Sequence, residues 1–162
     1  MWQIAPEMFD KILEVLPKGK TILELGSGEG TKLLSEHYNM ISIEHDSAYI
    51  GLHKSTYIHA PLNKLPKPRK YFPEDTHWYD KQTLERELPK YTYDLILVDG
   101  PQNIYGRGGF YRCFELFNDN VPIFLDDTHR KREKDMAILI SGKVQRPCTF
   151  YNTWTPKHFA VI

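Results

Sequence analysis

Neither sign of charge is in excess in this sequence. Its 162 residues include 21 Lys and Arg and 21 Asp and Glu, so the formal net charge is 0. A domain that binds a polyanion over a broad surface carries a strong positive charge, so this balance argues against nucleic acid as a partner while allowing a local basic patch. Hydrophobic residues make up 41% and charged residues 26%, which is typical of a globular protein and argues against disorder.

Cysteines and long apolar runs are also scarce. Cys113 and Cys148 are the only cysteines, and their spacing matches neither a zinc site nor a CxxC pair. Two thiols do not make a disulfide framework in a domain of this size, so we expect a reduced, cytoplasmic protein. No stretch approaches the roughly 20 apolar residues of a membrane span, and residues 1–6 do not resemble a signal peptide. We expect a single domain over residues 1–162 with no membrane partner, and a homodimer is left open.

Hydrophobic periodicity predicts alternating helices and strands. Helices are expected over residues 6–16, 31–38, 82–88, 109–117 and 133–140, with another beginning after Asp46. Strands are expected over residues 21–25, 40–44, 56–60, 94–99 and 121–126, and a terminal hairpin over 149–154 and 157–162. Five strands joined by helices require a mostly parallel sheet with helices on both faces. The predicted fold is therefore a doubly wound α/β fold, with a seven-stranded sheet that ends in a C-terminal antiparallel hairpin.

One stretch, residues 63–80, has no clear periodicity and is rich in Pro and Lys. Such a segment inside a compact domain is a lid, a binding loop or a disordered insert. We expect it to be mobile without ligand and to cover the pocket when ligands bind. Trp78 and Tyr79 within it either stack on a ligand or anchor the loop to the core.

In sheets of this kind, ligands bind just beyond the carboxyl ends of the strands. Gly26, Gly28 and Gly30 follow the first predicted strand and open a helix, where glycine permits a tight turn and close approach of a ligand. Glu44 ends the second strand, 20 residues after Glu24, and a carboxylate there can accept both hydroxyls of a ribose. Together these features predict a nucleoside cofactor.

The spacing of the glycines separates two kinds of nucleoside cofactor. Dinucleotide-binding folds use G-x-G-x-x-G and place a pyrophosphate on the helix N-terminus. Here the spacing is G-x-G-x-G, and Glu24 lies two residues before the first glycine. A carboxylate at that place repels a pyrophosphate and favours a cation.

Two segments resemble motifs of the class I S-adenosylmethionine-dependent methyltransferases. Residues 24–30 (Glu-Leu-Gly-Ser-Gly-Glu-Gly) resemble the family's first motif, and residues 93–99 resemble its fourth-strand motif. The C-terminal hairpin is also typical of that family. The resemblance implies that S-adenosylmethionine is the cofactor, and that Glu24, Gly26, Ser27, Gly28, Glu44, His45 and Asp99 contact it. In that arrangement Glu24 and the glycine turn meet the methionine part, Glu44 binds the ribose and His45 lies beside the adenine.

The sequence departs from the family pattern after the third strand. Many members carry an acid there that binds the adenine amine, but this chain has His59-Ala60-Pro61-Leu62. We therefore expect the amine to meet a backbone carbonyl near Ala60, or a group from residues 63–80.

Acidic residues also end two other strands. Asp99 ends one, and Asp126 and Asp127 end the next. Adjacent parallel strands end about 5 Å apart, so three unpaired carboxylates are expected beside the methyl group, where they would suit Mg²⁺. This pattern resembles the metal-dependent sugar and catechol O-methyltransferases, in which the ion holds two substrate hydroxyls. The alternative is that Asp99 only helps to hold the cofactor and that Asp127 caps the next helix.

The remaining candidates concern the substrate. His129 is either a general base or a surface histidine. The basic runs 64–70 and 129–134 are expected to rim the pocket, and together with Arg107 and Arg112 they favour an anionic molecule. The amino-methylating motif Asn/Asp-Pro-Pro-Tyr is absent, since residues 99–102 are Asp-Gly-Pro-Gln.

From these features we expect O-methylation of a small-molecule substrate, sugar-like or anionic, with Asp99, Asp126, Asp127 and His129 as the catalytic candidates. The alternatives are a nicotinamide-dependent oxidoreductase and a non-catalytic module that binds a nucleoside or a partner.

Overall fold

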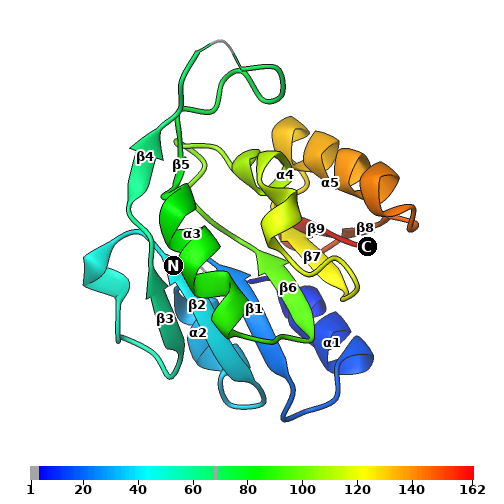
Figure 1. Ribbon diagram of the computed structural model, residues 1–162. Coiled ribbons are helices and arrows are strands. Elements are labelled where there is room, and N and C mark those ends of the chain that lie inside the picture. The colour runs from blue at the N-terminus through cyan, green and yellow to red at the C-terminus, as the bar shows by residue number, and fades with distance from the viewer. Residues whose placement is uncertain (1–3, 68) are drawn as a thin grey trace.

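The computed structural model describes residues 4–67 and 69–162, and its centre is a seven-stranded sheet in the order β3-β2-β1-β6-β7-β9-β8 (Figure 1). Five strands run parallel: β1 (Thr21–Leu25), β2 (Asn39–Glu44), β3 (Thr56–His59), β6 (Leu95–Val98) and β7 (Ile123–Asp126). The C-terminal hairpin of β8 (Thr149–Asn152) and β9 (His158–Val161) joins the edge, with β9 antiparallel to β7. The predicted fold class is confirmed.

Helices cover both faces of the sheet. On one face, α1 (Pro6–Val15) and α2 (Glu29–Leu34) bury Met8, Ile12 and Leu34 against strand residues such as Ile22 and Leu97. The other face is covered by α3 (Lys81–Glu87), α4 (Gly109–Arg112) and α5 (Lys131–Val144). Alternate strand residues point to opposite helix layers, which explains why the strands read as continuous apolar runs.

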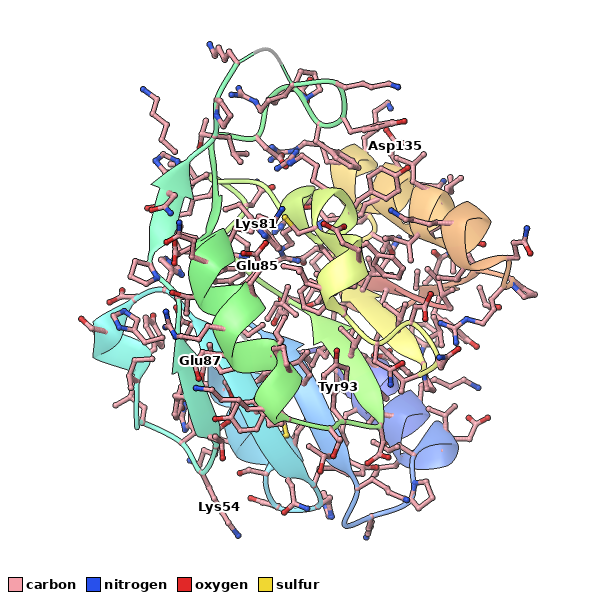
Figure 2. The ribbon with its side chains drawn as sticks, viewed as in Figure 1. Lys54, Lys81, Glu85, Glu87, Tyr93 and Asp135 are labelled. Atoms are coloured by element: carbon pink, nitrogen blue, oxygen red, sulfur yellow. The ribbon has the colours of Figure 1, made fainter. Side chains whose placement is uncertain are left out.

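The third helix shows how local sequence sets an element. Asp80 caps α3 by accepting a hydrogen bond from the Thr83 backbone N–H at 2.9 Å. Leu84 on its inner face is fully buried, whereas Lys81 and Glu85 form an exposed ion pair at 3.6 Å (Figure 2). The helix thus lies on the sheet by its apolar stripe, as the periodicity predicted.

Four predicted helices differ from the observed elements. The helix expected over 31–38 begins earlier and ends earlier, as α2 (Glu29–Leu34). The helix expected after Asp46 is a single 3-10 turn, η1 (Ser47–Tyr49), and that expected over 109–117 is divided into α4 and the 3-10 turn η3 (Phe114–Leu116). A further 3-10 turn, η2 (Leu88–Lys90), extends α3, and α5 is longer than residues 133–140 at both ends. Helix α5 ends only at Gln145, which adopts a left-handed conformation.

Residues 63–80 contain more regular secondary structure than predicted. They begin and end in a small antiparallel sheet of β4 (Leu62–Lys64) and β5 (His77–Tyr79). Trp78 and Tyr79 are 3% and 1% exposed and belong to the main core, so their role is to anchor the segment. A three-residue strand with one partner carries too little periodicity to be seen in sequence. Pro68, within the predicted lid, lies outside the described residues.

Asp75 fixes this segment to the body of the domain. Its buried carboxylate accepts hydrogen bonds from the Gly108 backbone N–H at 2.8 Å, from Arg112 at 3.1 Å and from Arg132 at 3.3 Å. The segment therefore has one firm attachment beside β5. In the described ranges 4–67 and 69–162, no helix is both long and apolar enough to cross a bilayer.

Candidate functional site

A cavity of about 460 Å³ opens at the carboxyl ends of the parallel strands. This volume lies within the range of roughly 300–1,000 Å³ that small-molecule sites occupy. Its walls come from the loops that follow β1, β2, β6 and β7, together with Ile4 before α1 and Lys157 before β9. Of the predicted cofactor residues, the cavity is lined by Glu24, Gly26, Ser27, Gly28, Glu44, His45 and Asp99.

Glu44 ties the end of β2 to the glycine turn. One of its oxygens accepts a hydrogen bond from the Ser27 backbone N–H at 2.8 Å, and the other accepts from the backbone N–H groups of His45 and Asp46. The His45 ring also lies 2.9 Å from this carboxylate. A carboxylate oxygen has two lone pairs, so Glu44 keeps the capacity to accept from a ribose.

Glu24 is a buried carboxylate beneath the same turn. One oxygen accepts hydrogen bonds from Ser42, its partner across β1 and β2, and from Thr31 at 2.6 Å. Thr31 in turn accepts from the Gly28 backbone N–H at 2.9 Å, so the acid and the turn hold one another. Burial outweighs these hydrogen bonds and raises the pKa of Glu24 to about 8.

The end of the cavity beyond β2 is apolar and aromatic. Tyr49, Leu52 and His53 line it, and Leu52 is 61% exposed. The sequence pattern placed Tyr49 and Leu52 on a helix, and nothing in it marked them as site residues. Ala60 is fully buried in the core, and no described residue of 61–80 lines the cavity.

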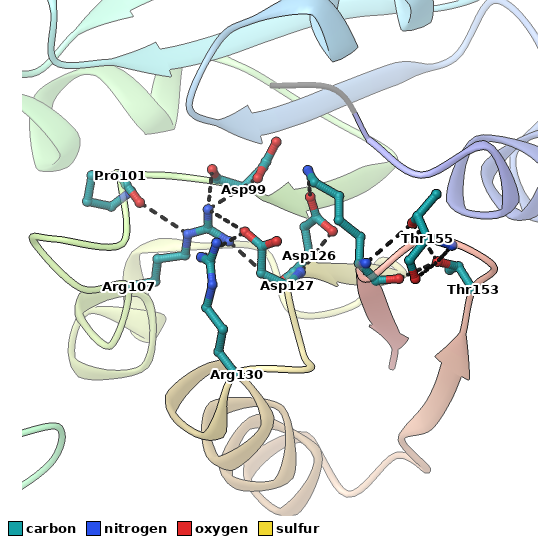
Figure 3. A network of polar contacts seen from close by, with 9 residues as sticks. Asp99, Pro101, Arg107, Asp126, Asp127, Arg130, Thr153 and Thr155 are labelled. Atoms are coloured by element: carbon teal, nitrogen blue, oxygen red, sulfur yellow. Dashed lines mark hydrogen bonds and ion pairs between the residues drawn. The ribbon is translucent and has the colours of Figure 1, made fainter. Parts of the chain in front are cut away.

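Asp99, Asp126 and Asp127 come together as strand geometry predicted. One carboxylate oxygen from each lies within 4.8 Å of the others. Figure 3 shows Arg107 between Asp99 and Asp127, with Arg130 directed toward Asp127. Asp127 has a φ of 62°, a left-handed backbone that is strained for a non-glycine residue.

The expectation that these carboxylates are unpaired is wrong. Arg107 lies 3.2 Å from Asp99 and 3.1 Å from Asp127. Arg130 lies 2.9 Å from Asp127, and Lys157 lies 3.1 Å from Asp126. Three carboxylates thus face three cations. Burial and the Asp126 carboxylate still raise the pKa of Asp99 above its ordinary value, against the opposing effect of Arg107.

The other expectation for Asp127, that it caps the next helix, is also not met. The residue at the N-cap of α5 is Arg130, and no side chain caps this end. Only the Asp127 backbone carbonyl takes part, by accepting from the Arg130 N–H at 2.9 Å. The Asp127 side chain instead forms ion pairs with Arg107 and Arg130.

Several predicted residues lie away from the cavity. His129 is exposed and packs against His158, with ring centroids 5.9 Å apart. Arg112 holds Asp75 and the Tyr71 carbonyl. Of the basic run 129–134 only Arg130 lines the cavity, and the described residues of 64–70 do not. Lys157 was not predicted as a site residue, because its place is set by the register of β9 against β7 and by no local pattern.

No protein-family model and no curated protein matches the sequence. Solved structures do match. Precorrin 8W decarboxylase of Methanobacterium thermoautotrophicum is 10% identical with a TM-score of 0.60, over 99% of this chain and 91% of that one. A methyltransferase from Pyrococcus furiosus is 12% identical with a TM-score of 0.57, over 96% and 79%. The MycE methyltransferase of mycinamycin biosynthesis, in complex with Mg, SAH and mycinamycin VI, is 13% identical with a TM-score of 0.54, over 95% and 44%.

These likenesses show that the chain has the fold of the class I S-adenosylmethionine-dependent methyltransferases. At such identities they show the fold alone, and MycE is more than twice as long as the part that this chain matches. What the chain binds and does must therefore be argued from its own cavity.

Proposed function

We propose that this protein binds S-adenosylmethionine and transfers its methyl group to a small acceptor. The observation that carries the proposal is the hydrogen-bonded set around the glycine turn. Glu44 and Glu24 hold that turn from two strands, and both line one cavity. A carboxylate at each position suits a nucleoside that carries positive charge and does not suit a pyrophosphate.

The chain's own residues divide the tasks of binding. Glu44 accepts the ribose hydroxyls, and the exposed face of Leu52 with Tyr49 packs against the adenine ring. His45 lies at the same end, where its ring contacts Tyr105 edge-on at 5.8 Å. Glu24 and Asp99 are the acids along the part of the cavity where the methionine amine and the sulfonium belong, and a cation bound there favours their ionised forms and lowers their raised pKa values.

An oxygen acceptor fits the residues around Asp99. When bound, S-adenosylmethionine supplies an electrophilic methyl group, which passes to the acceptor oxygen as S-adenosylhomocysteine leaves. Asp99 takes the hydroxyl proton, because a carboxylate with a raised pKa in a cavity is a competent base near neutral pH. Orientation of the two reactants supplies most of the acceleration. We propose a sugar-like or anionic small molecule as the acceptor. The two free cysteines suit a reducing compartment, so we propose a cytoplasmic location.

A divalent cation does not fit the aspartates as they stand. Mg²⁺ prefers oxygen ligands, and three are close enough. However, the ion would have to displace Lys157 and the arginines, of which Arg107 is only 6% exposed. We therefore propose transfer without a metal, and the Mg present with MycE makes this worth testing directly.

The nicotinamide alternative is weaker, because the glycine spacing is G-x-G-x-G and the sheet ends in an antiparallel hairpin. Calorimetry separates the two: S-adenosylhomocysteine should bind and NAD should not. Glu44→Gln should weaken that binding, because a neutral amide donates where the carboxylate accepts. Glu36→Gln, at an exposed position in the turn between α2 and β2, should leave it unchanged. Binding of NAD alone would refute the proposal.

The non-catalytic alternative is separated by activity. A binding module would take up S-adenosylhomocysteine but would not consume S-adenosylmethionine with any hydroxyl compound. Release of S-adenosylhomocysteine in the presence of a panel of sugars, sugar acids and sugar phosphates would establish transfer.

A further inference from the structure

The two ends of the cavity are lined by residues of opposite charge. Toward β1 and β2, the charged residues that line it are the acids Glu24, Glu29 and Glu44. Its cationic residues, as far as the described chain extends, lie at the other end, beyond Asp99. They are Arg107, Arg130 and Lys157. One end therefore suits a positively charged molecule and the other a negatively charged one.

Two of these cations have donors to spare. The Lys157 ammonium has three donors and uses one on Asp126, at 3.1 Å. Arg130 lies 2.9 Å from Asp127 but outside hydrogen-bond geometry, and its side chain donates no hydrogen bond to any described residue. Their side chains are 23% and 25% exposed, so both reach the cavity surface.

Arg107 has a different role from these two. It donates to the carbonyls of Pro101 and Asp99 at 3.1 and 2.8 Å and to the Asp99 carboxylate at 3.2 Å. It is 6% exposed, so it is a scaffold that ties the loop after β6 to the end of β7. Its donors are used within the protein.

The carboxylates hold Lys157 and Arg130 from beneath. The Asp126 side chain is fully buried and that of Asp127 is 3% exposed, whereas the cations above them are partly open. Thr153 also donates to the Lys157 carbonyl and fixes the turn of the hairpin (Figure 3). Cations held in place before a ligand arrives bind it at a lower cost in conformational entropy.

We propose that Arg130 and Lys157 form a site for an oxyanion, a carboxylate or phosphate group, on the methyl acceptor; the assignment to the acceptor rests on the function proposed above. The cofactor's own carboxylate is the other source of such a group. Asp126 ends β7 and Asp127 follows it, and β7 is three strands from β2 in the sheet, or about 14 Å from Glu44 at the usual strand spacing. Asp99 lies between, so an acceptor anchored on the cations places its reacting hydroxyl toward Asp99.

The test uses inorganic phosphate as the probe, titrated in EDTA into protein saturated with S-adenosylhomocysteine and followed by NMR shifts. Arg130→Gln and Lys157→Gln should each weaken phosphate binding about tenfold or more, since each removes a charge-assisted hydrogen bond. Lys131→Gln is the control, because that neighbouring side chain is 85% exposed and pairs with Asp135. Its phosphate affinity should equal that of the unmodified protein.

Two results would overturn the proposal. One is phosphate affinity that Arg130→Gln and Lys157→Gln leave unchanged. The other is competition between phosphate and S-adenosylhomocysteine, which would assign the cations to the cofactor's carboxylate. If Lys157→Gln does not fold, Lys157→Arg should keep phosphate binding, and the double variant Asp126→Asn with Lys157→Gln should lose it. Failure of S-adenosylhomocysteine to bind the unmodified protein and every variant would count against the proposed function. That failure is detected at the saturation step, before any phosphate is added.

Discussion

Gly26 and Gly100 bring the turns after β1 and β6 into backbone contact. A Cβ atom added to Gly100 would lie 2.7 Å from the Gly26 Cα atom and 2.7 Å from the Tyr79 hydroxyl. Gly26 itself has a φ of +90°, which glycine adopts without strain. This contact closes the floor of the cavity between the two strands that carry Glu24 and Asp99.

Gly100→Ala should therefore destabilise the fold and weaken cofactor binding. The added methyl group cannot be accommodated without moving backbone, and overpacking of this kind costs about 1–3 kcal/mol. Gly142→Ala is the matched control, because that glycine is exposed in α5 with nothing within 4 Å, and alanine there should stabilise by about 0.5–1 kcal/mol. Urea denaturation of both variants measures the difference. A Gly100→Ala variant as stable as the unmodified protein would contradict the close contact.

The buried acid Glu24 should make stability depend on pH. Its pKa is about 8 in the folded protein and 4.5 as a model compound, so the folded state binds the proton more tightly. The stability contributed by the protonated form is complete below pH 4.5 and is lost as the pH rises through 8, by up to about 5 kcal/mol. Glu24→Gln removes this titration and keeps an oxygen that accepts from Ser42 and Thr31.

Glu24→Gln should thus be more stable than the unmodified protein at pH 8.5 and differ little from it at pH 4.5. The same variant should bind S-adenosylhomocysteine more weakly, since it loses the one acid beneath the turn that can ionise beside the ligand's ammonium group. Denaturation at pH 4.5, 6.5 and 8.5, with calorimetry at each pH, checks both effects. Parallel stability profiles for the two proteins would show that Glu24 does not titrate as inferred.

The parallel strands and the glycine turn could be predicted from the sequence because their signals are local. Each strand is a run of apolar residues buried on both faces, and the residue that ends it is placed at the sheet edge by topology alone. Glu24, Glu44 and Asp99 could therefore be assigned to one cavity without coordinates, and the structure places all three there.

What the sequence could not provide was the pairing of the aspartates. Lys157 reaches Asp126 only because β9 runs antiparallel to β7, and Arg107 reaches Asp99 through the course of an irregular loop. Such contacts depend on loop conformation, for which periodicity carries no information. Likewise, β4 and β5 are too short to show alternation, and Asp75 meets its partners across 33 to 57 residues of chain.

Asp75 should be among the most sensitive positions for stability outside the cavity. Asp75→Ala leaves Arg112 and Arg132 without their buried partner and the Gly108 N–H without an acceptor, at a cost of about 3 kcal/mol. Asp135→Ala is the comparison, since Asp135 (labelled in Figure 2) forms an exposed pair with Lys131 that should contribute less than about 1 kcal/mol. Hydrogen exchange should also rise over residues 75–79 in Asp75→Ala. Equal effects of the two substitutions would show that the attachment is unimportant.

Charge balance at the three aspartates should keep divalent cations from binding there. Three carboxylates opposite three cations do not repel one another strongly, so Mg²⁺ has little to gain at this site. Millimolar Mg²⁺ or Mn²⁺ should not raise the melting temperature of the unmodified protein, and EDTA should affect neither stability nor S-adenosylhomocysteine affinity. A ligand that bound the folded state alone would raise the melting temperature by mass action.

Removing one cation should reverse this behaviour. Lys157→Gln leaves the buried Asp126 carboxylate without its partner beside Asp99 and Asp127, which restores the excess of negative charge that a divalent cation relieves. That variant should be destabilised in EDTA and partly recovered by Mg²⁺, with Mn²⁺ broadening NMR signals from the ends of β6 and β7. Lys131→Gln should show neither effect. If instead the unmodified protein is stabilised by Mg²⁺ to saturation, the ion displaces Lys157 and Arg107 on binding, and the metal-dependent mechanism applies after all.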